Sequence, residues 1–388
     1  MNATLPKTRR GAIAATSPAA ARGSVASACP IIGVSVSFRP VSSPILSNDP
    51  MIARSRDSSK RIRNEGAFSM AMTKSGRRRR NKPVFLYGPV PSRRLGYSLG
   101  VDIVPLKTCS MDCVYCQLGS NPVTTVRKKG YAPIKAVVSQ IRTVLESGRR
   151  IDVITFSGSG EPTLHAGIGR MIRDIKTMTD LPVVVLTNSS SLTTDGGRKK
   201  ILGADIVVPS LDAATEAVFK NINRPAAGLT AAKIIRGLVK FRAAYQGQIW
   251  LEIMLVKGVN DSPAHLKKLK EAVARIRPDK IQLNTVVRPP AEKSARPLGR
   301  RELERIRLLF GAAAEIIAHF RKKERDTAAV DIEDAVRAMV GRRPVTSRDI
   351  SLSLGVSGGV VRRTLRRLLD KGAVRASAHR GSTYYERR

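Results

Sequence analysis

Three cysteines within eight residues are the part of this chain best suited to chemistry. Cys109, Cys113 and Cys116 lie in the segment CSMDCVYC, with the spacing C-x3-C-x2-C. Thiolates are soft ligands that select zinc or iron–sulfur clusters. A structural zinc needs a fourth Cys or His close by, whereas a four-iron cluster with one open iron needs three protein ligands. None of the four histidines lies in this segment, so iron–sulfur is favoured and zinc stays open.

The fourth cysteine, Cys29, lies in a leader of different composition. Residues 1–80 hold 15 Lys or Arg against 3 Asp or Glu, and they lack a sustained helix or strand period. Such a segment buries too little apolar surface to fold, so we expect a disordered basic leader in which Cys29 is inert. Two origins stay open. One is a targeting segment, which would be Arg- and Ser-rich and acid-poor, and the other is a mis-called start upstream of Met70 or Met72.

The middle of the chain, residues 81–325, alternates strand-like and helix-like segments. The strand-like runs are nearly continuously apolar and cover 153–157, 181–186, 204–209, 248–256 and 280–287. Helical spacing occurs between them at 165–178, 231–245 and 263–276. This alternation predicts an α/β fold with a parallel sheet covered by helices. The length and the number of repeats fit a full or partial β/α barrel.

Polar residues stand directly after three of these strands. They are the segment 157–161 after the first strand, Asn188 after the second, and Ser210 with Asp212 after the third. The carboxyl ends of parallel strands meet at one edge, which is where barrels place their chemistry. We therefore expect these side chains to surround one site.

The last part, residues 326–388, predicts a small separate domain. Three amphipathic helices are expected, followed by two strands around Gly381. They cover 332–340, 347–354, 359–369, 373–377 and 383–386. This order resembles a winged helix-turn-helix domain, in which the third helix enters the major groove of DNA. That helix carries Arg362, Arg363, Arg366 and Arg367. A domain of this kind that contacts RNA or protein stays open.

The composition limits the classes of protein to which the chain can belong. Its 388 residues allow two or three domains, and four cysteines are too few for a disulfide-built scaffold. No run approaches the ~18 apolar residues of a membrane span. A net charge of +39 suits a phosphate-rich partner such as nucleic acid, although a genome that favours Arg codons would also produce it.

The segment CSMDCVYC resembles the signature of the radical S-adenosylmethionine (SAM) superfamily, C-x3-C-x-aromatic-C, with Tyr115 in the aromatic place. The GGE-like motif of that superfamily is matched at 156–164, FSGSGEPTL, where Ser159 replaces the first glycine while Gly160 and Glu161 match. The resemblance covers about residues 85–290. It implies a partial (β/α)6 radical SAM barrel, a [4Fe–4S] cluster and SAM.

The resemblance also implies a reaction. The three cysteines hold three irons, and the fourth iron binds SAM. One electron then breaks a carbon–sulfur bond to give a 5′-deoxyadenosyl radical, which abstracts hydrogen from a substrate. Such an oxidoreductase-like enzyme implies an electron donor such as flavodoxin or ferredoxin, and a cytoplasmic location.

The contacts to SAM that the resemblance implies come from three strand ends and the cluster loop. The SAM amino group is assigned to the GGE-like motif, the ribose or carboxylate to the two later strand ends, and the adenine to the aromatic residue. The residues implied for the amino group are Ser159, Gly160 and Glu161. Those for the ribose or carboxylate are Asn188, Ser210 and Asp212, and the one for the adenine is Tyr115. Ordinary helix capping stays open for Asn188 and Ser210.

A narrower resemblance concerns residues 87–119, which are similar to a bacterial branch related to the tRNA wybutosine (wyosine) synthases. Together with the charge, it makes tRNA or another RNA the expected substrate. Wyosine synthases carry a second cluster on upstream cysteines, but this chain has no cysteine between Cys29 and Cys109, so their reaction is not implied. Ser92, Arg93 and Arg94, in the turn before the cluster loop, either bind an anion or form a salt-bridged surface turn.

A protein without catalysis stays open as the alternative function. In it, an iron–sulfur or zinc centre would serve a regulator that binds nucleic acid through the C-terminal domain. The zinc form lacks a fourth ligand and leaves the β–α repeats and the segment SGSGEPTL without a role. Enzyme and regulator differ in whether they cleave SAM.

Overall fold

The computed structural model describes residues 83–92, 94–121, 123–317 and 332–388. The predicted leader, residues 1–80, lies outside the described residues, and so does Cys29. The predicted domain boundary at 325 and 326 also falls outside them, so these two predictions stay predictions.

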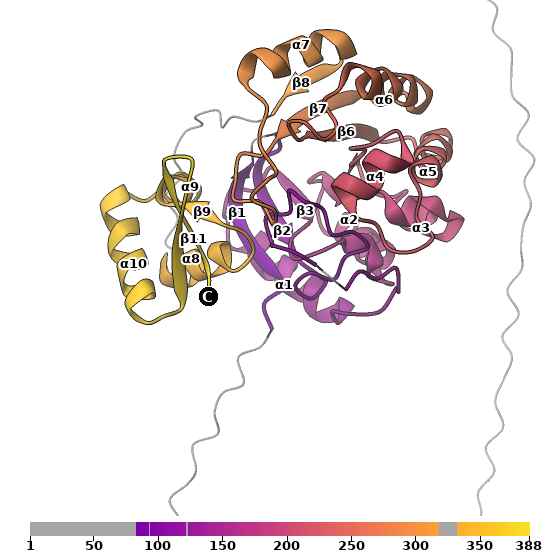
Figure 1. Ribbon diagram of the computed structural model, residues 1–388. Helices are drawn as coiled ribbons and strands as arrows, with labels where there is room; N and C mark the ends of the chain where they lie inside the picture. Colours follow the sequence, from indigo (N-terminus) through magenta and orange to yellow (C-terminus); the bar gives the residue numbers. More distant parts are fainter. Residues whose placement is uncertain (1–82, 93, 122, 318–331) are drawn as a thin grey trace, which may run out of the picture. The chain divides into compact units, whose positions relative to one another are not determined.

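One eight-stranded sheet organises the larger part of the chain (Figure 1). The strands follow one another in space in the order of the sequence, from β1 to β8. β1 runs antiparallel to β2, and every other neighbouring pair is parallel. The strands are β1 (Leu86–Ser92), β2 (Gly96–Val101), β3 (Val153–Phe156), β4 (Val183–Thr187), β5 (Ile206–Pro209), β6 (Gln248–Leu255), β7 (Lys280–Thr285) and β8 (Ala314–Ile316).

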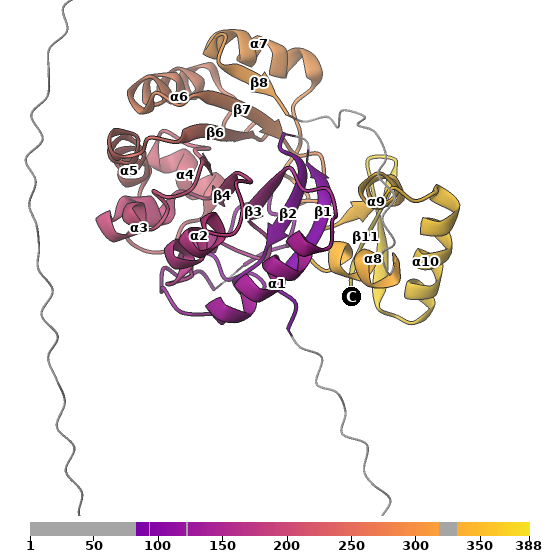
Figure 2. The ribbon, with the colours of Figure 1, turned by 180° about the vertical axis from the view of Figure 1, so that it is seen from behind.

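Helices connect the parallel strands and lie on one face of the sheet (Figures 1 and 2). A parallel pair needs such a crossover, because a short turn cannot bring the chain back to the same edge. The helices are α1 (Ile134–Glu146), α2 (Ile168–Lys176), α3 (Asp195–Lys200), α4 (Glu216–Asn223), α5 (Ala231–Ala244), α6 (Pro263–Ile276) and α7 (Arg300–Phe310). Side-chain caps start three of them, with Thr194, Thr230 and Ser262 each accepting from a backbone N–H.

The core explains why the predicted strands are nearly continuously apolar. In β4, Val183 and Val185 belong to the large cluster shared with the helices. Val184 belongs to a separate cluster with Leu95, Val153, Val208 and Trp250. Successive strand side chains point to opposite faces, so both faces of this strand are buried.

The predicted strands and helices of the middle part are confirmed to within a few residues. β1, β2 and β8 were missed. β1 (LYGPVPS) and β2 (GYSLGV) contain turn-forming residues such as glycine, and β8 has only three residues. β1 is an edge strand, where proline is tolerated. β1 and β8 are the two edge strands of the eight-stranded sheet. The partial (β/α)6 barrel itself stays a prediction.

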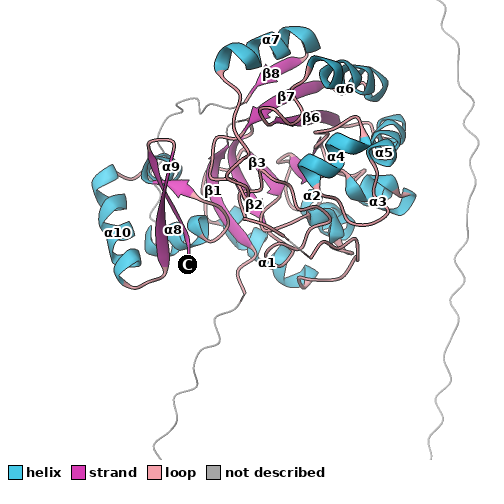
Figure 3. Cartoon of the chain, viewed as in Figure 1, coloured by secondary structure: helices cyan, strands magenta, loops and turns pink. Residues whose placement is uncertain are grey.

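The C-terminal part has the predicted order of elements (Figure 3). Its elements are α8 (Ile332–Val340), β9 (Val345–Thr346), α9 (Ser347–Leu354), α10 (Gly358–Asp370), β10 (Val374–His379) and β11 (Ser382–Arg387). The strands form a separate antiparallel sheet in the order β10-β11-β9. The identity of this unit as a winged helix-turn-helix domain stays a prediction.

This C-terminal part has its own core and is joined to β1. Val361, Leu365 and Leu368 of α10 are buried in a cluster that also contains Val90 of β1. The four arginines of α10 lie on its exposed face. A helix with one apolar and one basic face is therefore anchored on one side and open to a partner on the other.

None of the described helices is long and apolar enough to cross a membrane.

Replacement of Leu365 by Ala tests the C-terminal core. Leu365 is 1% exposed and Leu369 is 36% exposed on the same helix. We expect Leu365→Ala to lower the stability of this part by about 2–5 kcal/mol through the cavity it leaves, and Leu369→Ala to cost far less. Hydrogen–deuterium exchange of α8 to α10 in the full chain measures the difference. Equal exchange in the two variants would contradict the assigned core.

Candidate metal centre and active site

The loop after β2 carries the three cysteines, and its backbone is held at several points. The N–H of Thr125 donates to the carbonyl of Cys109 at 2.8 Å, and the N–H of Cys116 donates to the carbonyl of Cys113 at 2.9 Å. All three cysteines are free thiols. The N–H of Asp112 donates to the carbonyl of Asn223 at 3.1 Å, which ties the loop to the end of α4.

A cavity of about 350 Å³ lies over these cysteines. Its walls come from strand β1, the cluster loop, the loop after β3, strands β4 and β6, helix α8 and the turn that follows α8. The residues that bear on the site are Tyr87, Lys107, Cys109, Cys113, Tyr115, Cys116, Gly160, Met254, Met339, Arg342 and Arg343. The three thiols, the aromatic residue and the motif glycine that the sequence singled out thus meet in one cavity.

Burial keeps the thiols neutral in the free protein. It raises the pKa of Cys109 to about 12, with a further contribution from the charge of Glu161. Burial also raises the pKa of Cys113, and the charges of Asp212 and Cys109 add to that effect. The pKa of Cys116 is raised by burial as well. Within the described residues, no group of three or more Cys, His, Asp or Glu is arranged around a single metal ion. Because burial favours the protonated thiols, binding of a metal by these cysteines would require them to release their protons.

Two asparagines donate to the sulfur atoms. Asn188 Nδ2 lies 3.3 Å from Cys109 Sγ, and Asn223 Nδ2 lies 3.4 Å from Cys113 Sγ. Amide N–H groups stabilise a thiolate more than a thiol, so these contacts favour the ligating form. Asn188 was predicted as a site residue, whereas Asn223 was missed. It lies at the end of a helix, 107 residues beyond Cys116, and no motif marks it.

Glu161 is buried and makes four hydrogen bonds. Its Oε1 accepts from the N–H and hydroxyl of Thr163 at 3.1 and 2.6 Å and from the hydroxyl of Thr187 at 2.8 Å. Its Oε2 accepts from the N–H of Asn188 at 2.6 Å. Burial raises the pKa of Glu161, and these hydrogen bonds act in the opposite direction. Glu161 therefore joins the loop after β3 to the end of β4 and supports the cavity from behind.

The rest of the GGE-like motif is also tightly held. Ser159 donates to Asp102 through its N–H at 3.0 Å and through its hydroxyl at 2.5 Å. A Cβ at Gly160 would lie 2.1 Å from the carbonyl oxygen of Thr108, so this backbone approach requires glycine. Gly160 lines the cavity, while Ser159 and Glu161 lie behind it.

Asp212 anchors Tyr115. The Tyr115 hydroxyl donates to the Asp212 carboxylate, which also accepts from Asn223 Nδ2 at 2.7 Å and from the N–H of Met254 at 2.9 Å. Burial raises the pKa of Asp212 to about 6 against the effect of these donors. Protein donors therefore occupy both of its oxygens. Asn188, Ser210 and Asp212 line a small cavity with Tyr115, next to the cysteines.

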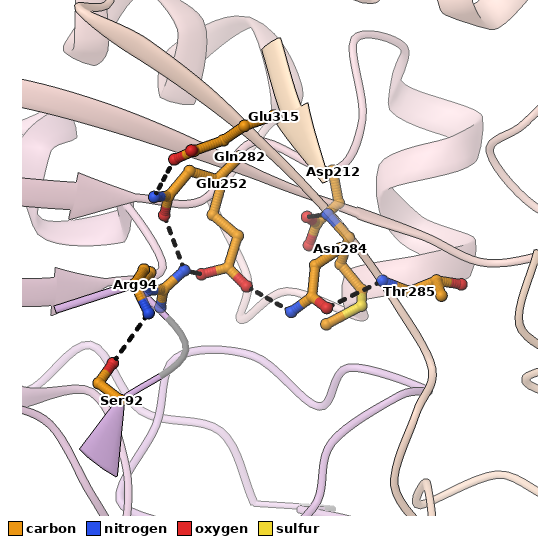
Figure 4. A network of polar contacts seen from close by, with 9 residues as sticks. Ser92, Arg94, Asp212, Glu252, Gln282, Asn284, Thr285 and Glu315 are labelled. Atoms are coloured by element: carbon orange, nitrogen blue, oxygen red, sulfur yellow. Dashed lines mark hydrogen bonds and ion pairs between the residues drawn. The ribbon is translucent and has the colours of Figure 1, made fainter. Parts of the chain in front are cut away.

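Arg94 belongs to a polar network on the face of the sheet away from the helices (Figure 4). Its Nη1 lies 2.7 Å from Glu252 and 2.9 Å from Gln282. The side chains of Arg94 and Glu252 are 11% and 15% exposed. Of the two roles left open for this turn, Arg94 forms a salt bridge, but a largely buried one to a carboxylate on β6. Arg93 lies outside the described residues.

Helix α8 and the turn after it bring residues to the cavity that no sequence motif indicated. Arg342 Nε lies 3.3 Å from Asp102, the same carboxylate that holds Ser159. Its guanidinium also lies 4.6 Å from the ring centre of Tyr87. A contact across 240 residues thus links the C-terminal part to the loop after β3.

Comparison with known proteins assigns the class. The family model of the Radical SAM superfamily matches residues 103–269. A UPF0026 protein of Helicobacter pylori strain J99 is 32% identical over 279 residues, which cover 71% of this chain and 89% of the relative. The chain therefore belongs to the UPF0026 family, and its residues 103–269 match the model of the Radical SAM superfamily. Its cofactors are the [4Fe–4S] cluster and SAM that this superfamily binds.

Two other relatives match over part of their length. A GTPase Obg of Brachyspira hyodysenteriae is 36% identical over 304 residues, which cover 77% of this chain and 45% of the relative. The chain thus spans less than half of that protein. A dual-specificity RNA methyltransferase RlmN of Nitratidesulfovibrio vulgaris is 28% identical over 194 residues, which cover 47% of this chain and 51% of the relative.

Glu161→Gln tests the support behind the cavity. Either orientation of the new amide places an NH2 against backbone or hydroxyl donors, so buried donors lose their acceptor. We expect the stability of the metal-free protein to fall by about 1–3 kcal/mol. Glu304→Gln is the matched control, because Glu304 is 45% exposed in a surface ion pair, which contributes little. Urea unfolding measures both, and equal midpoints would contradict the role of Glu161.

Proposed function

We propose that this chain is a radical SAM enzyme whose cluster is held by Cys109, Cys113 and Cys116 and whose substrate is RNA. The observation that carries the proposal is the single cavity in which three otherwise neutral, free thiols meet a motif loop of the superfamily. Three thiolates leave one iron of a cubane open, and the cavity above them has room for a second ligand.

The residues of the chain divide the work of holding the cofactors. When bound, the cluster and SAM supply the cleavage of a carbon–sulfur bond by one electron and hence a 5′-deoxyadenosyl radical. Asn188 and Asn223 donate to two of the sulfurs and favour their charged form. Asp212 orients Tyr115 against the cavity, and the absence of a side chain at Gly160 lets the motif backbone approach the cluster loop.

The contacts to SAM remain those that the resemblance implies, with the geometry dividing them into two groups. Tyr115 and Gly160 line the cavity and are placed to contact SAM directly. Glu161, Ser159 and Asp212 already accept or donate several protein hydrogen bonds, so we propose that they act mainly by positioning the loops. Asn188 and Ser210 lie beside Tyr115 at the neighbouring strand ends.

RNA is the proposed substrate class for three reasons. The chain carries a net charge of +39. The similar RlmN protein is by its name an RNA methyltransferase. The four arginines of α10 are exposed on one helix face, which suits phosphate contacts by a winged helix-turn-helix domain. The electron donor of flavodoxin or ferredoxin type and the cytoplasmic location remain predictions of the sequence.

Single Cys→Ala changes test the cluster. Replacement of Cys109, Cys113 or Cys116 should remove most iron from the anaerobically reconstituted protein and abolish formation of 5′-deoxyadenosine with dithionite, because the ligand set is incomplete. Cys29→Ala is the control and should change neither. A triple variant that still binds about four irons would contradict the assignment. A cluster that forms without SAM cleavage would favour the regulator.

The substrate class is tested in cells. Bulk tRNA and ribosomal RNA from a deletion strain should lack a modified nucleoside that is present in the parent, measured by mass spectrometry of digested RNA. A copy with Cys113→Ala should fail to restore it, and the unchanged gene should restore it. Identical nucleoside profiles in parent and deletion strain would count against RNA.

A further inference from the structure

A second cavity, of about 550 Å³, lies beside the cluster loop and has a strongly basic lining. It is formed by the segment after the cluster loop, the turn after β4, and helix α5 with the turn before it. We call it the basic groove. Its charged residues are Lys128, Arg198, Lys233, Arg236 and Lys240.

The lining of the basic groove carries charge of one sign, unlike that of the neighbouring cavity. Among the described residues that line it, five are basic and none is acidic. The neighbouring cavity of about 610 Å³ is lined by Asp112, Glu216, Lys220 and Arg224, which balance. The nearest carboxylate with a contact to the groove is Asp195, 3.5 Å from Arg198.

Two of the five cations at the groove are open to a ligand, whereas Lys128, Arg198 and Lys233 already donate to protein oxygens. Arg236 and Lys240 are exposed on α5, and no hydrogen bond or ion pair joins them to the described part of the chain. Burial and the nearby Lys200 lower the pKa of Lys128, as expected where cations gather without an anion. Such crowding is unfavourable in the free protein and is relieved when a polyanion binds.

The groove lies near the cysteine cavity, with the balanced cavity between them. It shares Gly228 and Leu229 with the balanced cavity, which in turn shares Asn121 with the cavity over the cysteines. On its inner side, Ser190 accepts a 2.7 Å hydrogen bond from Ser110, the neighbour of Cys109. A chain of phosphates in the groove would therefore run alongside the cluster loop, within reach of the site.

We propose that the basic groove binds the phosphate backbone of the RNA substrate and so presents one nucleotide to the cavity over the cysteines. This inference rests on the proposed function, because it assumes that the substrate is RNA. Arginine and lysine side chains on α5 and after the cluster loop suit phosphate oxygens, which position a nucleic acid without reading its bases. A nucleotide turned out of a loop can then reach a recessed site.

The test uses the full-length protein with its cluster and fluorescein-labelled bulk bacterial tRNA. The variant is Arg236→Glu with Lys240→Glu. The matched control is Lys135→Glu with Arg142→Glu, two exposed cations on α1, so both variants have the same net charge. We expect the groove variant to bind tRNA at least about tenfold more weakly, with the slope of log affinity against log salt reduced by about 1.4–1.8. The control should change affinity by less than about twofold.

The outcomes separate the inference from the proposed function. If both variants lose affinity equally, or if the groove variant binds as the unchanged protein does, the inference is overturned while an RNA substrate stands. If the unchanged protein binds no tRNA at about 150 mM salt, the RNA assignment falls as well. If a DNA duplex binds as tightly and loses as much in the groove variant, the groove is not specific to RNA. Unchanged iron content in both variants establishes that the fold is intact.

Discussion

The buried carboxylate of Glu161 is the contact on which the arrangement of the site depends. It holds the loop after β3 against Thr187 and Asn188 at the end of β4. Asn188 in turn donates to Cys109. A charged group with four donors in the interior is stable only while all of them stay in place. The position of Cys109 thus depends on the contacts between the loop after β3 and the end of β4.

The same use of buried polar groups extends around the cavity. Asp212 collects three donors from three elements and thereby fixes Tyr115 beside the cysteines. The thiols themselves are neutral and desolvated, with pKa values raised by burial. A buried cavity keeps water away from the reactive species that the proposed reaction forms. Iron bound by the three cysteines would compensate the cost of burying their negative charge.

The C-terminal part is more than an appended module. Through Arg342 it reaches Asp102, the partner of Ser159, and Met339 and Arg343 line the cavity. Residues near the end of the chain therefore form one wall of a site whose other walls come from the sheet. A partner bound at the exposed arginines of α10 would lie on the same small domain that closes this wall.

Local signals in the sequence predicted most of the elements and the three cysteines that we propose as ligands. Apolar runs with period and punctuation located β3 to β7, α6, α8 and α9, and the spacing of three cysteines located the cluster loop, because these signals are local in the chain. Other features follow from the folded structure alone. Glu161 and Asp212 accept hydrogen bonds from protein donors, and Asn223 donates to Cys113. Arg94 turns inward to Glu252, and α8 lines the site. Each of these depends on a contact between residues more than 25 positions apart, and no local periodicity or spacing encodes which distant side chains a folded chain brings together.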